Sequence, residues 1–308
     1  MPELPEVESL VRFLAEQAVG RTVARVYPVA VHALKTYDPP LTALEGTVID
    51  GVARHGKFID IRTGDIRTGD GPPGELHLVF HLARAGWVRW NDALPTAPPR
   101  PSKGPLALRV RLADPDAPDP DAPDPGGAGF DVTEAGTQKH LAIYVVRDPQ
   151  QVPGIARLGP DPLAEDFTLP RFAALLEGER RQIKGVLRDQ GTIAGIGNAY
   201  SDEILHAARM SPFKLAANLT GDEVAGLHAA IGTTLADAIE RSRGLPLREL
   251  KAEKKSGLRV HGRTGEPCPV CGDTIREVSF SDSSLQYCPT CQTNGKPLAD
   301  RRMSRLLK

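Results

Sequence analysis

The sequence has 308 residues, of which 40% are hydrophobic and 25% charged, enough chain for two or three domains with buried cores. It contains no apolar run long enough to cross a bilayer and does not begin like a signal peptide, so we expect a soluble, intracellular protein. The formal net charge of −1 hides an asymmetry, because residues 241–308 contain 14 Lys and Arg against 7 Asp and Glu. This local excess of positive charge predicts a polyanionic partner for the C-terminal part.

The first six residues, Met1-Pro2-Glu3-Leu4-Pro5-Glu6, place a reactive group at the start of the chain. Once Met1 is removed, Pro2 carries a free secondary amine, and an α-amino group with a pKa of about 7.7–8 keeps a useful neutral fraction near pH 7. Such an amine can attack a sugar aldehyde carbon and form an iminium, with the Glu3 carboxylate placed to move protons. The alternative is that Pro2 and Pro5 only begin a helix.

Apolar residues at helical spacing predict a helix over Leu4–Ala18. The period then changes, and short alternating segments separated by turn residues predict an antiparallel sandwich or barrel. The predicted strands are Thr22–Val29, Thr47–Val52, Lys57–Ile61, Glu75–Phe80, Trp87–Trp90, Leu106–Leu112 and Leu141–Arg147. Two insertions interrupt them, a doubled Ile-Arg-Thr-Gly-Asp at 61–70 and a doubled acidic, proline-rich segment at 116–125. The second predicts a solvated loop without chemistry.

Prolines are dense between Asp148 and Pro170, where the pattern changes from strand to helix, so we place a domain boundary there. Helices are predicted at about Pro170–Leu176, Arg181–Gln190, Ala199–Arg209 and Gly221–Arg241. Thr220 and Glu223 form a capping box for the last helix. We divide the chain into residues 1–150, 151–262 and 263–308.

A glycine-punctuated connection joins two of these helices, and the second helix opens at Gly197-Asn198. The start of a helix offers unpaired N–H groups and a positive dipole end, so this stretch predicts a seat for a phosphate, with the Asn198 amide as a further donor. The alternative is an antiparallel helix pair with a flexible turn. Because this Gly-x-Gly follows a helix rather than a strand, a dinucleotide-binding fold is disfavoured.

All four cysteines lie near the C-terminus, as Cys268-Pro-Val-Cys271 and, sixteen residues later, Cys288-Pro-Thr-Cys291. This spacing is typical of one structural zinc ion bound by four thiolates, and the residues between predict a hairpin with strands at about Ile275–Phe280 and Leu285–Tyr287. The alternative is a pair of disulfides, which an intracellular chain disfavours. Basic residues flank the finger: Arg259, His261 and Arg263 before it, and Lys296, Arg301, Arg302 and Arg305 after it.

Two turns in the N-terminal part carry basic residues. In Arg54-His55-Gly56-Lys57, Lys57 is either an ordinary surface lysine or a phosphate contact near the amine. In His81-Leu82-Ala83-Arg84-Ala85-Gly86, Arg84 could reach into DNA as a finger.

Together these motifs resemble the formamidopyrimidine-DNA glycosylase / endonuclease VIII family of bifunctional DNA repair enzymes. The resemblance covers nearly the whole chain and is carried by these segments: 1–8, 54–58, 155–163, 182–205, 260–268 and the four cysteines. It implies an α+β multidomain fold, with an N-terminal β-sandwich framed by helices, then a helix–two-turn–helix domain with a zinc hairpin. It also implies a monomer that binds damaged double-stranded DNA, with no membrane association, in a bacterial-type cytoplasm.

The resemblance implies a role for each candidate residue. Pro2 is the nucleophile at the sugar C1′ and Glu3 the general acid/base, with Glu6 supporting the lesion site. The phosphates flanking the lesion are held by Lys57 and Asn198. Beyond the resemblance, we expect further DNA contacts from Lys184, Arg84 and Arg263. Cys268, Cys271, Cys288 and Cys291 bind Zn²⁺. The damaged nucleotide is flipped out of the stack, and β/δ-elimination follows the iminium. Residues 251–257 occupy the place of a loop that in some relatives closes over a flipped purine.

Departures from the family pattern concern base flipping and lesion choice. Where the family has an arginine at the hairpin tip, this chain has Ser283. A methionine of the purine-specific branch aligns with Arg84, and an arginine–phenylalanine pair has no counterpart in Glu134–Gln138. The lesion therefore stays open between an oxidised purine and an oxidised pyrimidine, and Arg84 is our candidate for a wedge that also carries charge.

Two other functions compete with the glycosylase. One is a non-catalytic protein that senses damaged or branched DNA through its helical pair and zinc finger. It would apply if Met1 is retained, because the Pro2 nitrogen is then an amide. The other is a zinc-ribbon enzyme of RNA metabolism, for which the sequence offers no catalytic cluster.

Overall fold

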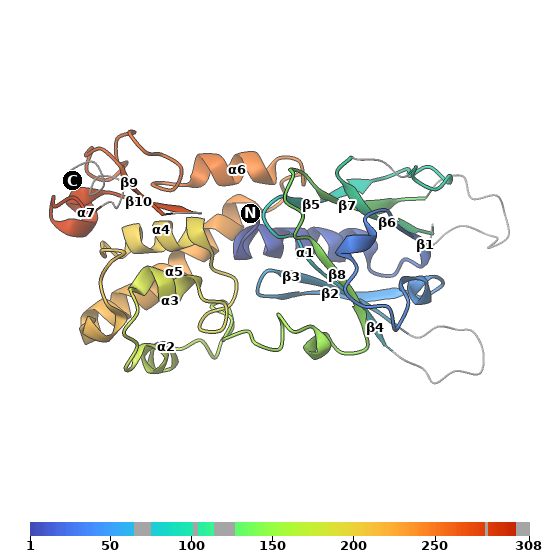
Figure 1. Ribbon diagram of the computed structural model, residues 1–308, viewed down its shortest axis with the longest axis horizontal. Coiled ribbons are helices and arrows are strands. Elements are labelled where there is room, and N and C mark those ends of the chain that lie inside the picture. The colour runs from blue at the N-terminus through green and yellow to red at the C-terminus, as the bar shows by residue number, and fades with distance from the viewer. Residues whose placement is uncertain (65–74, 101–103, 114–126, 281–282, 300–308) are drawn as a thin grey trace. The chain divides into compact units, whose positions relative to one another are not determined.

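The computed structural model describes residues 1–64, 75–100, 104–113, 127–280 and 283–299 (Figure 1). The chain divides into two compact units. The first comprises Met1–Pro2, Glu6–Arg157 and Gly244–Glu249, and the second Glu3–Pro5, Leu158–Arg243 and Leu250–Lys308. The predicted acidic loop, the second copy of Ile-Arg-Thr-Gly-Asp and the tail residues Arg301, Arg302 and Arg305 lie outside the described residues. Our three-part division of the chain stays a prediction.

The first unit contains two four-stranded antiparallel sheets. The strands of one, in spatial order, are β1 (Val23–Pro28), β6 (Leu106–Leu112), β7 (Gly129–Glu134) and β5 (Gly86–Asn91). Those of the other are β2 (Ile49–His55), β3 (Phe58–Thr63), β4 (Leu76–His81) and β8 (Ala142–Val146). Short 3₁₀ turns lie at Val31–Ala33, Leu41–Leu44 and Pro149–Gln151. Two sheets rather than one closed sheet confirm the predicted sandwich and exclude the barrel.

Helix α1 (Leu4–Ala18) contacts both sheets. Its Glu8 accepts a hydrogen bond from Arg54 of β2 at 2.8 Å, and the ring of Phe13 lies 6.0 Å from that of Trp90 on β5. Leu10 and Leu14 at helical spacing are fully buried, as the sequence period predicts. The apolar stripe of α1 therefore helps to form the core of this unit.

Strand β7 is the one strand of this sandwich that the sequence pattern did not reveal. It follows the acidic, proline-rich segment, and the sequence pattern predicts no strand between Leu112 and Leu141. In the sheet, Asp131 lies opposite Arg109 of β6 and accepts two hydrogen bonds from its guanidinium, at 2.7 and 2.8 Å. The paired charge makes burial of the carboxylate tolerable, and the pair is a feature of the sheet register rather than of local sequence.

A buried carboxylate links three strands of the second sheet. Asp60 on β3 contacts His55 Nε2 at 3.0 Å and His77 Nδ1 at 2.8 Å. Burial by itself raises the pKa of Asp60, but hydrogen bonds and charge from the two histidines together hold it below its ordinary value of 3.8. Burial by itself lowers the pKa of His77, but its hydrogen bond and charge interaction with Asp60, assisted by Glu75, raise it above 6.5.

We expect this cluster to give the first unit a pH-dependent stability. The raised pKa of His77 means that its contribution is complete below about pH 6.5 and is lost as the pH rises through the folded-state value. The Asp60 contribution is present above its ordinary pKa and is lost as the pH falls through the lowered one. His77→Asn should therefore reduce the free energy of unfolding more at pH 5 than at pH 8. Both tryptophans lie in β5, so urea unfolding followed by tryptophan fluorescence reports on this unit, and an equal loss at both pH values would contradict the assignment.

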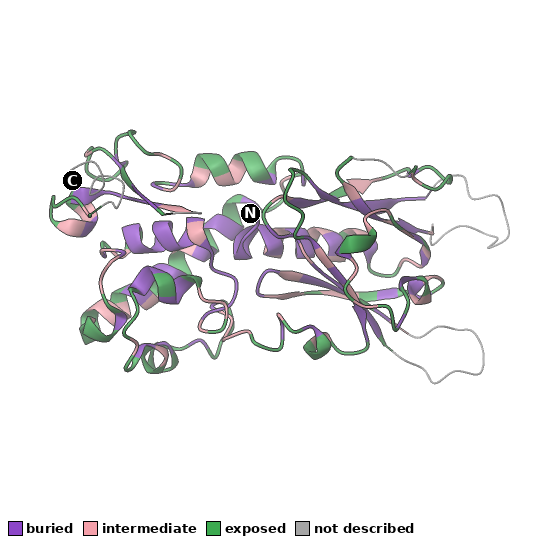
Figure 2. Cartoon of the chain, in the orientation of Figure 1, coloured by how far each residue is buried: buried purple, intermediate pink, exposed green. Residues whose placement is uncertain are grey.

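The second unit is built around the helices α2 (Leu169–Leu176), α3 (Ile183–Arg188), α4 (Asn198–Ala207) and α5 (Gly221–Arg241), followed by α6 (Leu250–Gly257). A 3₁₀ turn at Ala216–Asn218 precedes α5, and the hairpin β9 (Arg276–Ser279) and β10 (Ser284–Tyr287) ends in the short helix α7 (Pro289–Thr293). The predicted capping box of Thr220 and Glu223 is confirmed. Figure 2 shows that α4 is buried over most of its length, at the centre of the helical core.

Helix α6 corrects an expectation. The resemblance placed a closing loop at residues 251–257, but the structure has a helix of eight residues there. Lys254 lies over the ring of Tyr200, with its ammonium 4.9 Å from the ring centroid, a cation–π contact that ties α6 to α4. Among the described residues, no helix is long and apolar enough to cross a membrane.

Candidate active site and metal centre

The candidate residues of the first unit are mostly buried. Pro2 is buried, whereas Met1 in front of it is 48% exposed. Glu6 and Lys57 are also buried, so the interpretation of Lys57 as an ordinary surface lysine is wrong. Arg84 is exposed, in the turn between β4 and β5. Removal of Met1 would thus leave the amine of Pro2 on a residue that the fold already fixes.

His81 is a residue of this site for which the sequence motifs predicted no role. Burial, together with the charge of Lys57, lowers the pKa of His81 to about 4, so the ring is neutral at physiological pH. Its Nδ1 accepts a hydrogen bond from the backbone N–H of Ala83 at 3.2 Å, which leaves the proton on Nε2. The signal in the sequence was weak, because a single histidine at a strand end is common. Its proximity to Lys57 appears only in the fold.

The carboxylate of Glu3 caps the N-terminus of α4. Its Oε2 accepts hydrogen bonds from the backbone N–H groups of Gly197 at 2.7 Å and Tyr200 at 3.2 Å, and its Oε1 accepts one from Ala199 at 2.9 Å. The next residue, Leu4, donates its own N–H to Gly195 O at 3.0 Å. Three donors and the positive end of a helix dipole stabilise a negative charge and fix its position.

Gly197 makes this close approach feasible. Its backbone, with φ −128° and ψ −154°, is extended and open to any residue, so conformation does not require glycine here. A Cβ at this position would lie 2.7 Å from both carboxylate oxygens of Glu3. At Gly195 a Cβ would lie 2.8 Å from Cβ of Leu4, and the positive φ of 88° also favours glycine. Gly197 is therefore required because the start of α1 packs directly on this turn, and Gly195 for this reason and for its backbone conformation.

Two side chains, Gln190 and Asp189, stabilise the turn between α3 and α4 by hydrogen bonds to its backbone and to Thr192. Gln190 donates from Nε2 to Ile196 O at 2.7 Å and accepts at Oε1 from the N–H of Gly195 at 2.9 Å. Asp189 adds hydrogen bonds from Gly191 N and from the Thr192 hydroxyl, at 3.0 and 3.1 Å. This network holds the connection in one shape, so the alternative of a flexible turn is not supported.

The predicted phosphate seat at the start of α4 needs correction. The backbone N–H groups expected to hold a phosphate are bound to Glu3 instead. The Asn198 side chain donates from Nδ2 to Ser284 O at 2.8 Å, and its Oδ1 is buried without a partner in the described part of the chain. The predicted contact between Asn198 and a phosphate stays a prediction.

Lys184 lies in the interior rather than on a DNA-facing surface. Its ammonium donates to Asp202 Oδ1 at 2.6 Å, Ser201 Oγ at 2.7 Å and Asn198 O at 3.1 Å. Burial lowers the pKa of Lys184, against the charge of Asp202, which raises it. Because these bonds use all three protons of the ammonium, the residue joins α3 to α4 and is not available to a phosphate.

Two acidic residues of α4 hold the segment that leads into the cysteines. Glu203 accepts the backbone N–H groups of three successive residues, Arg259, Val260 and His261, at 2.8–3.0 Å. Burial raises the pKa of Glu203. The neighbouring Asp202 accepts a hydrogen bond from His261 Nδ1 at 2.7 Å. A run of backbone donors wrapped around a buried carboxylate positions this segment firmly on the helix.

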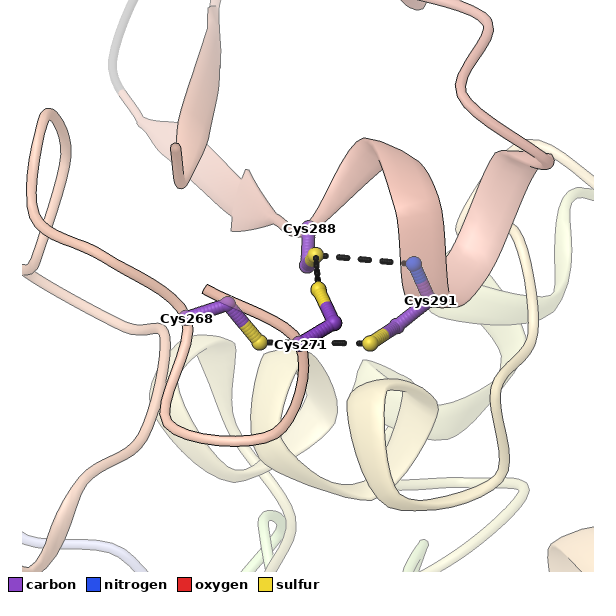
Figure 3. Close-up of side chains that lie close together, drawn as sticks. All are labelled: Cys268, Cys271, Cys288 and Cys291. Carbon is purple, nitrogen blue, oxygen red and sulfur yellow. Dashed lines mark hydrogen bonds between the residues drawn. The ribbon is translucent and has the colours of Figure 1, made fainter. Parts of the chain in front are cut away.

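The four cysteines converge, as Figure 3 shows. Their sulfur atoms all lie within 4.8 Å of one another, with Cys271 and Cys288 at 3.4 Å and Cys268 and Cys291 at 3.9 Å. Tetrahedral zinc with Zn–S bonds of about 2.3 Å places its sulfurs about 3.8 Å apart, so the arrangement fits this ion. All four are free thiols, which rules out the disulfide alternative. Burial raises the pKa of the Cys288 thiol to about 11, so a thiolate there needs a cation beside it.

We expect the hairpin to lose its fold when zinc is removed. Among its described residues the finger has small apolar clusters such as Val278, Leu285 and Tyr287, and a core of this size rarely supports a fold without a metal or another staple. Chelation should therefore abolish the hydrogen-exchange protection of the amides in β9 and β10, and Cys271→Ser should do the same. Chelator added to the Cys271→Ser variant should have no further effect. Protection that survives chelation in the unmodified protein would contradict a structural role for the metal.

Arg263 and α6 contribute to a basic hollow in the second unit. Arg263 pairs with Glu266 at 2.6 Å and also donates to Leu258 O at 3.2 Å. It lines a hollow of about 600 Å³ together with Lys251, Lys254, Lys255 and His261. Such a concentration of cations favours a polyanion, as the local charge balance predicts.

Models of three protein domains match the chain: the formamidopyrimidine-DNA glycosylase N-terminal domain over residues 1–118, the formamidopyrimidine-DNA glycosylase H2TH domain over 158–246, and a zinc finger found in FPG and IleRS over 265–294. The last match and the four-cysteine cluster confirm the prediction of one structural zinc ion.

Similar proteins agree with these matches. A formamidopyrimidine-DNA glycosylase of Symbiobacterium thermophilum is 35% identical over 98% of this chain and 93% of its own length. An uncharacterized formamidopyrimidine-DNA glycosylase-like protein of Mycobacterium tuberculosis is 62% identical over 49% of this chain and 94% of its own. A solved complex between the Lactococcus lactis Fpg and an abasic site containing DNA has a TM-score of 0.77 at 27% identity, covering 94% of this chain and 99% of that one. The chain belongs to the formamidopyrimidine-DNA glycosylase family, as its sequence motifs indicated.

Proposed function

We propose that this protein removes damaged bases from double-stranded DNA and cleaves the resulting abasic site, with Pro2 as the nucleophile. The observation that carries the proposal is the placement of Glu3. Directly after the candidate amine, a carboxylate is fixed by three backbone N–H groups at the start of α4. A group held so rigidly, adjacent in the chain to a potential nucleophile, suits proton transfer and the stabilisation of a developing cation.

The first chemical step forms a bond between the Pro2 nitrogen and C1′ of the damaged nucleotide. As this bond forms, the bond from C1′ to the base breaks, and the base leaves with its electron pair and takes up a proton. Loss of the amine proton and opening of the sugar ring at O4′ then give an iminium. Glu3, as general acid/base, moves protons to and from the sugar, and its negative charge stabilises the cationic intermediate.

Elimination follows from the iminium, which withdraws electrons from the sugar. Loss of a proton from C2′ expels the 3′ phosphate, and a further loss from C4′ expels the 5′ phosphate, leaving a gap with phosphate ends. Water then hydrolyses the remaining adduct and frees Pro2. Lys57, a buried cation beside neutral His81, would hold one of the phosphates that flank the lesion.

In this proposal, electrostatic attraction between basic residues and the phosphates binds the DNA. The basic hollow beside α6 and the exposed Arg84 supply positive charge. Solved structures similar to this chain include MutM in complex with carbocyclic 8-oxo-G containing DNA and the Lactococcus lactis Fpg bound to an AP site containing DNA. We propose that this protein binds duplex DNA as a monomer and that Arg84 serves as the wedge that replaces a flipped base.

A panel of single-lesion duplexes tests the function. We expect base release and strand cleavage on at least one duplex carrying an oxidised purine or pyrimidine, and cleavage of an abasic-site duplex. We also expect affinity to fall steeply with added salt, because phosphate contacts release counterions. Tight, salt-sensitive binding without strand cleavage on any duplex would favour the non-catalytic DNA-binding alternative instead.

A further inference from the structure

One stripe of α4 faces the zinc finger with polar side chains. Asn198, Asp202 and His206 follow each other at intervals of four residues, which places them on one side of the helix. Each has a partner in the C-terminal segment: Asn198 contacts Ser284 O at 2.8 Å, Asp202 the Gln286 N–H at 3.2 Å and His206 the sulfur of Cys268 at 3.3 Å. The last of these contacts reaches a ligand of the metal.

His206 is deeply buried, with an exposed fraction of 2%, and so is Cys268, also 2% exposed. Its Nε2 lies 3.3 Å from Cys268 Sγ, whereas its Nδ1 is buried and has no hydrogen-bond partner among the described residues. A histidine buried by chance would leave both nitrogens unsatisfied, at a cost of about 1–3 kcal/mol for each group. Here Nε2 contacts the sulfur and Nδ1 has no partner among the described residues. This indicates that the contact with the cysteine positions the ring.

The chemistry of the site fixes which atom donates. A cysteine bound to zinc is a thiolate and can only accept, so the proton of the pair must lie on His206 Nε2. A second proton on Nδ1 would be a buried donor without an acceptor, so the ring is the neutral tautomer with Nε2–H. The backbone N–H of Val270 also points to Cys268 Sγ, at 3.5 Å, so this sulfur receives donors from inside and outside the finger.

We propose that His206 is a positioning residue of the zinc site, which donates its Nε2–H to the Cys268 thiolate and thereby raises the affinity of the finger for zinc. Four thiolates around one Zn²⁺ leave a net negative charge that is partly buried, and a donated hydrogen bond spreads the charge on one sulfur. The donor comes from α4, whose first turn binds Glu3. Helix α4 thus binds the Glu3 carboxylate of the proposed active site at its start and, near its end, contributes a side chain that contacts a cysteine of the zinc site.

Substitution of the donor tests the proposal on the full-length, zinc-loaded protein. His206→Phe keeps a planar ring but removes the N–H, and we expect it to weaken zinc binding by about 10- to 100-fold in competition with a chromophoric chelator. His206→Gln retains an N–H donor and should restore part of the affinity. His228→Phe is the matched control, because His228 lies on α5 and donates to Phe167 O at 2.8 Å, and it should leave zinc binding unchanged.

A spectroscopic measurement separates hydrogen bonding from packing. With cobalt in place of zinc, His206→Phe should shift the sulfur-to-metal charge-transfer band to lower energy, because the sulfur loses a hydrogen bond that stabilises its electrons. A lower melting temperature with unchanged metal affinity and an unchanged band would show that His206 only fills space, and would overturn the proposal. If His206→Phe does not fold, NMR of the unmodified protein loaded with cadmium decides: scalar coupling between the His206 Nε2 proton and the metal is expected, and its absence overturns the proposal.

Discussion

Adding one residue between Met1 and Pro2 is expected to abolish covalent trapping of the protein on abasic-site DNA by borohydride. The added residue turns the Pro2 nitrogen into an amide, whose lone pair is delocalised into the carbonyl and cannot attack C1′. The unmodified chain, once Met1 is removed, should give a stable adduct, because borohydride reduces the iminium. Trapping should also increase between pH 6 and 8, as the neutral fraction of an α-amino group grows. Denaturing gel electrophoresis of the reduced adduct measures both effects.

Two variants sharpen this experiment. Pro2→Gly keeps a free amine but makes it primary and flexible, so we expect it to lose most of the trapped species without losing all of it. Pro5→Ala is the matched control, since Pro5 lies in the same segment but its nitrogen is an amide in every form of the chain. It should trap like the unmodified protein. Mass spectrometry must accompany the assay, because active protein that retains Met1 would refute the role of Pro2.

Local patterns in the sequence were sufficient for several of the regular elements. The bounds of α1 and α5 agree with the predicted helices, because an apolar stripe and clear end signals are contained within each segment. Strand β6 agrees as well, because its alternation is uninterrupted. The cysteine spacing predicted the metal site for a similar reason, since two short segments, each with two cysteines, supply all four ligands. In each case the physical cause lies within a few residues.

Contacts between distant residues could not be predicted in this way. The hydrogen bond from Gly197 to Glu3 joins positions separated by 194 residues. The sequence around Gly197 does not show which group binds the N–H groups at the start of α4. For the same reason the sequence predicted a phosphate site at the start of α4, where the N–H groups instead bind the carboxylate of Glu3. Lysine usually lies at the protein surface, but Lys184 is a buried partner of Asp202 because α3 packs on α4. One signal was available and missed: Asn198, Asp202 and His206 lie four residues apart on α4, and such a polar stripe indicates a second packing partner.

Replacing Gly197 by alanine is expected to damage the protein almost entirely through Glu3. Since the backbone of Gly197 is extended, alanine itself is acceptable there, but its Cβ would lie 2.7 Å from both oxygens of the carboxylate. Glu3 must then move and give up its backbone donors. We expect Gly197→Ala to reduce the rate of strand cleavage by about 10²–10⁴-fold, the range usual for loss of a general acid/base. Urea unfolding should show a loss of stability of about 1–3 kcal/mol.

A double-mutant cycle isolates the cause. In a Glu3→Ala background the carboxylate is absent, so Gly197→Ala should no longer reduce stability or activity further, and the two substitutions should be strongly non-additive. Gly185→Ala is the matched control, because Gly185 lies in α3 with no atom within 4 Å of a Cβ built on it. It should leave activity intact and raise stability by about 0.5–1 kcal/mol, as alanine does inside a helix. If Gly197→Ala and Glu3→Ala instead add independently, Glu3 does not depend on the start of α4, and its proposed role in proton transfer loses the geometry that supports it.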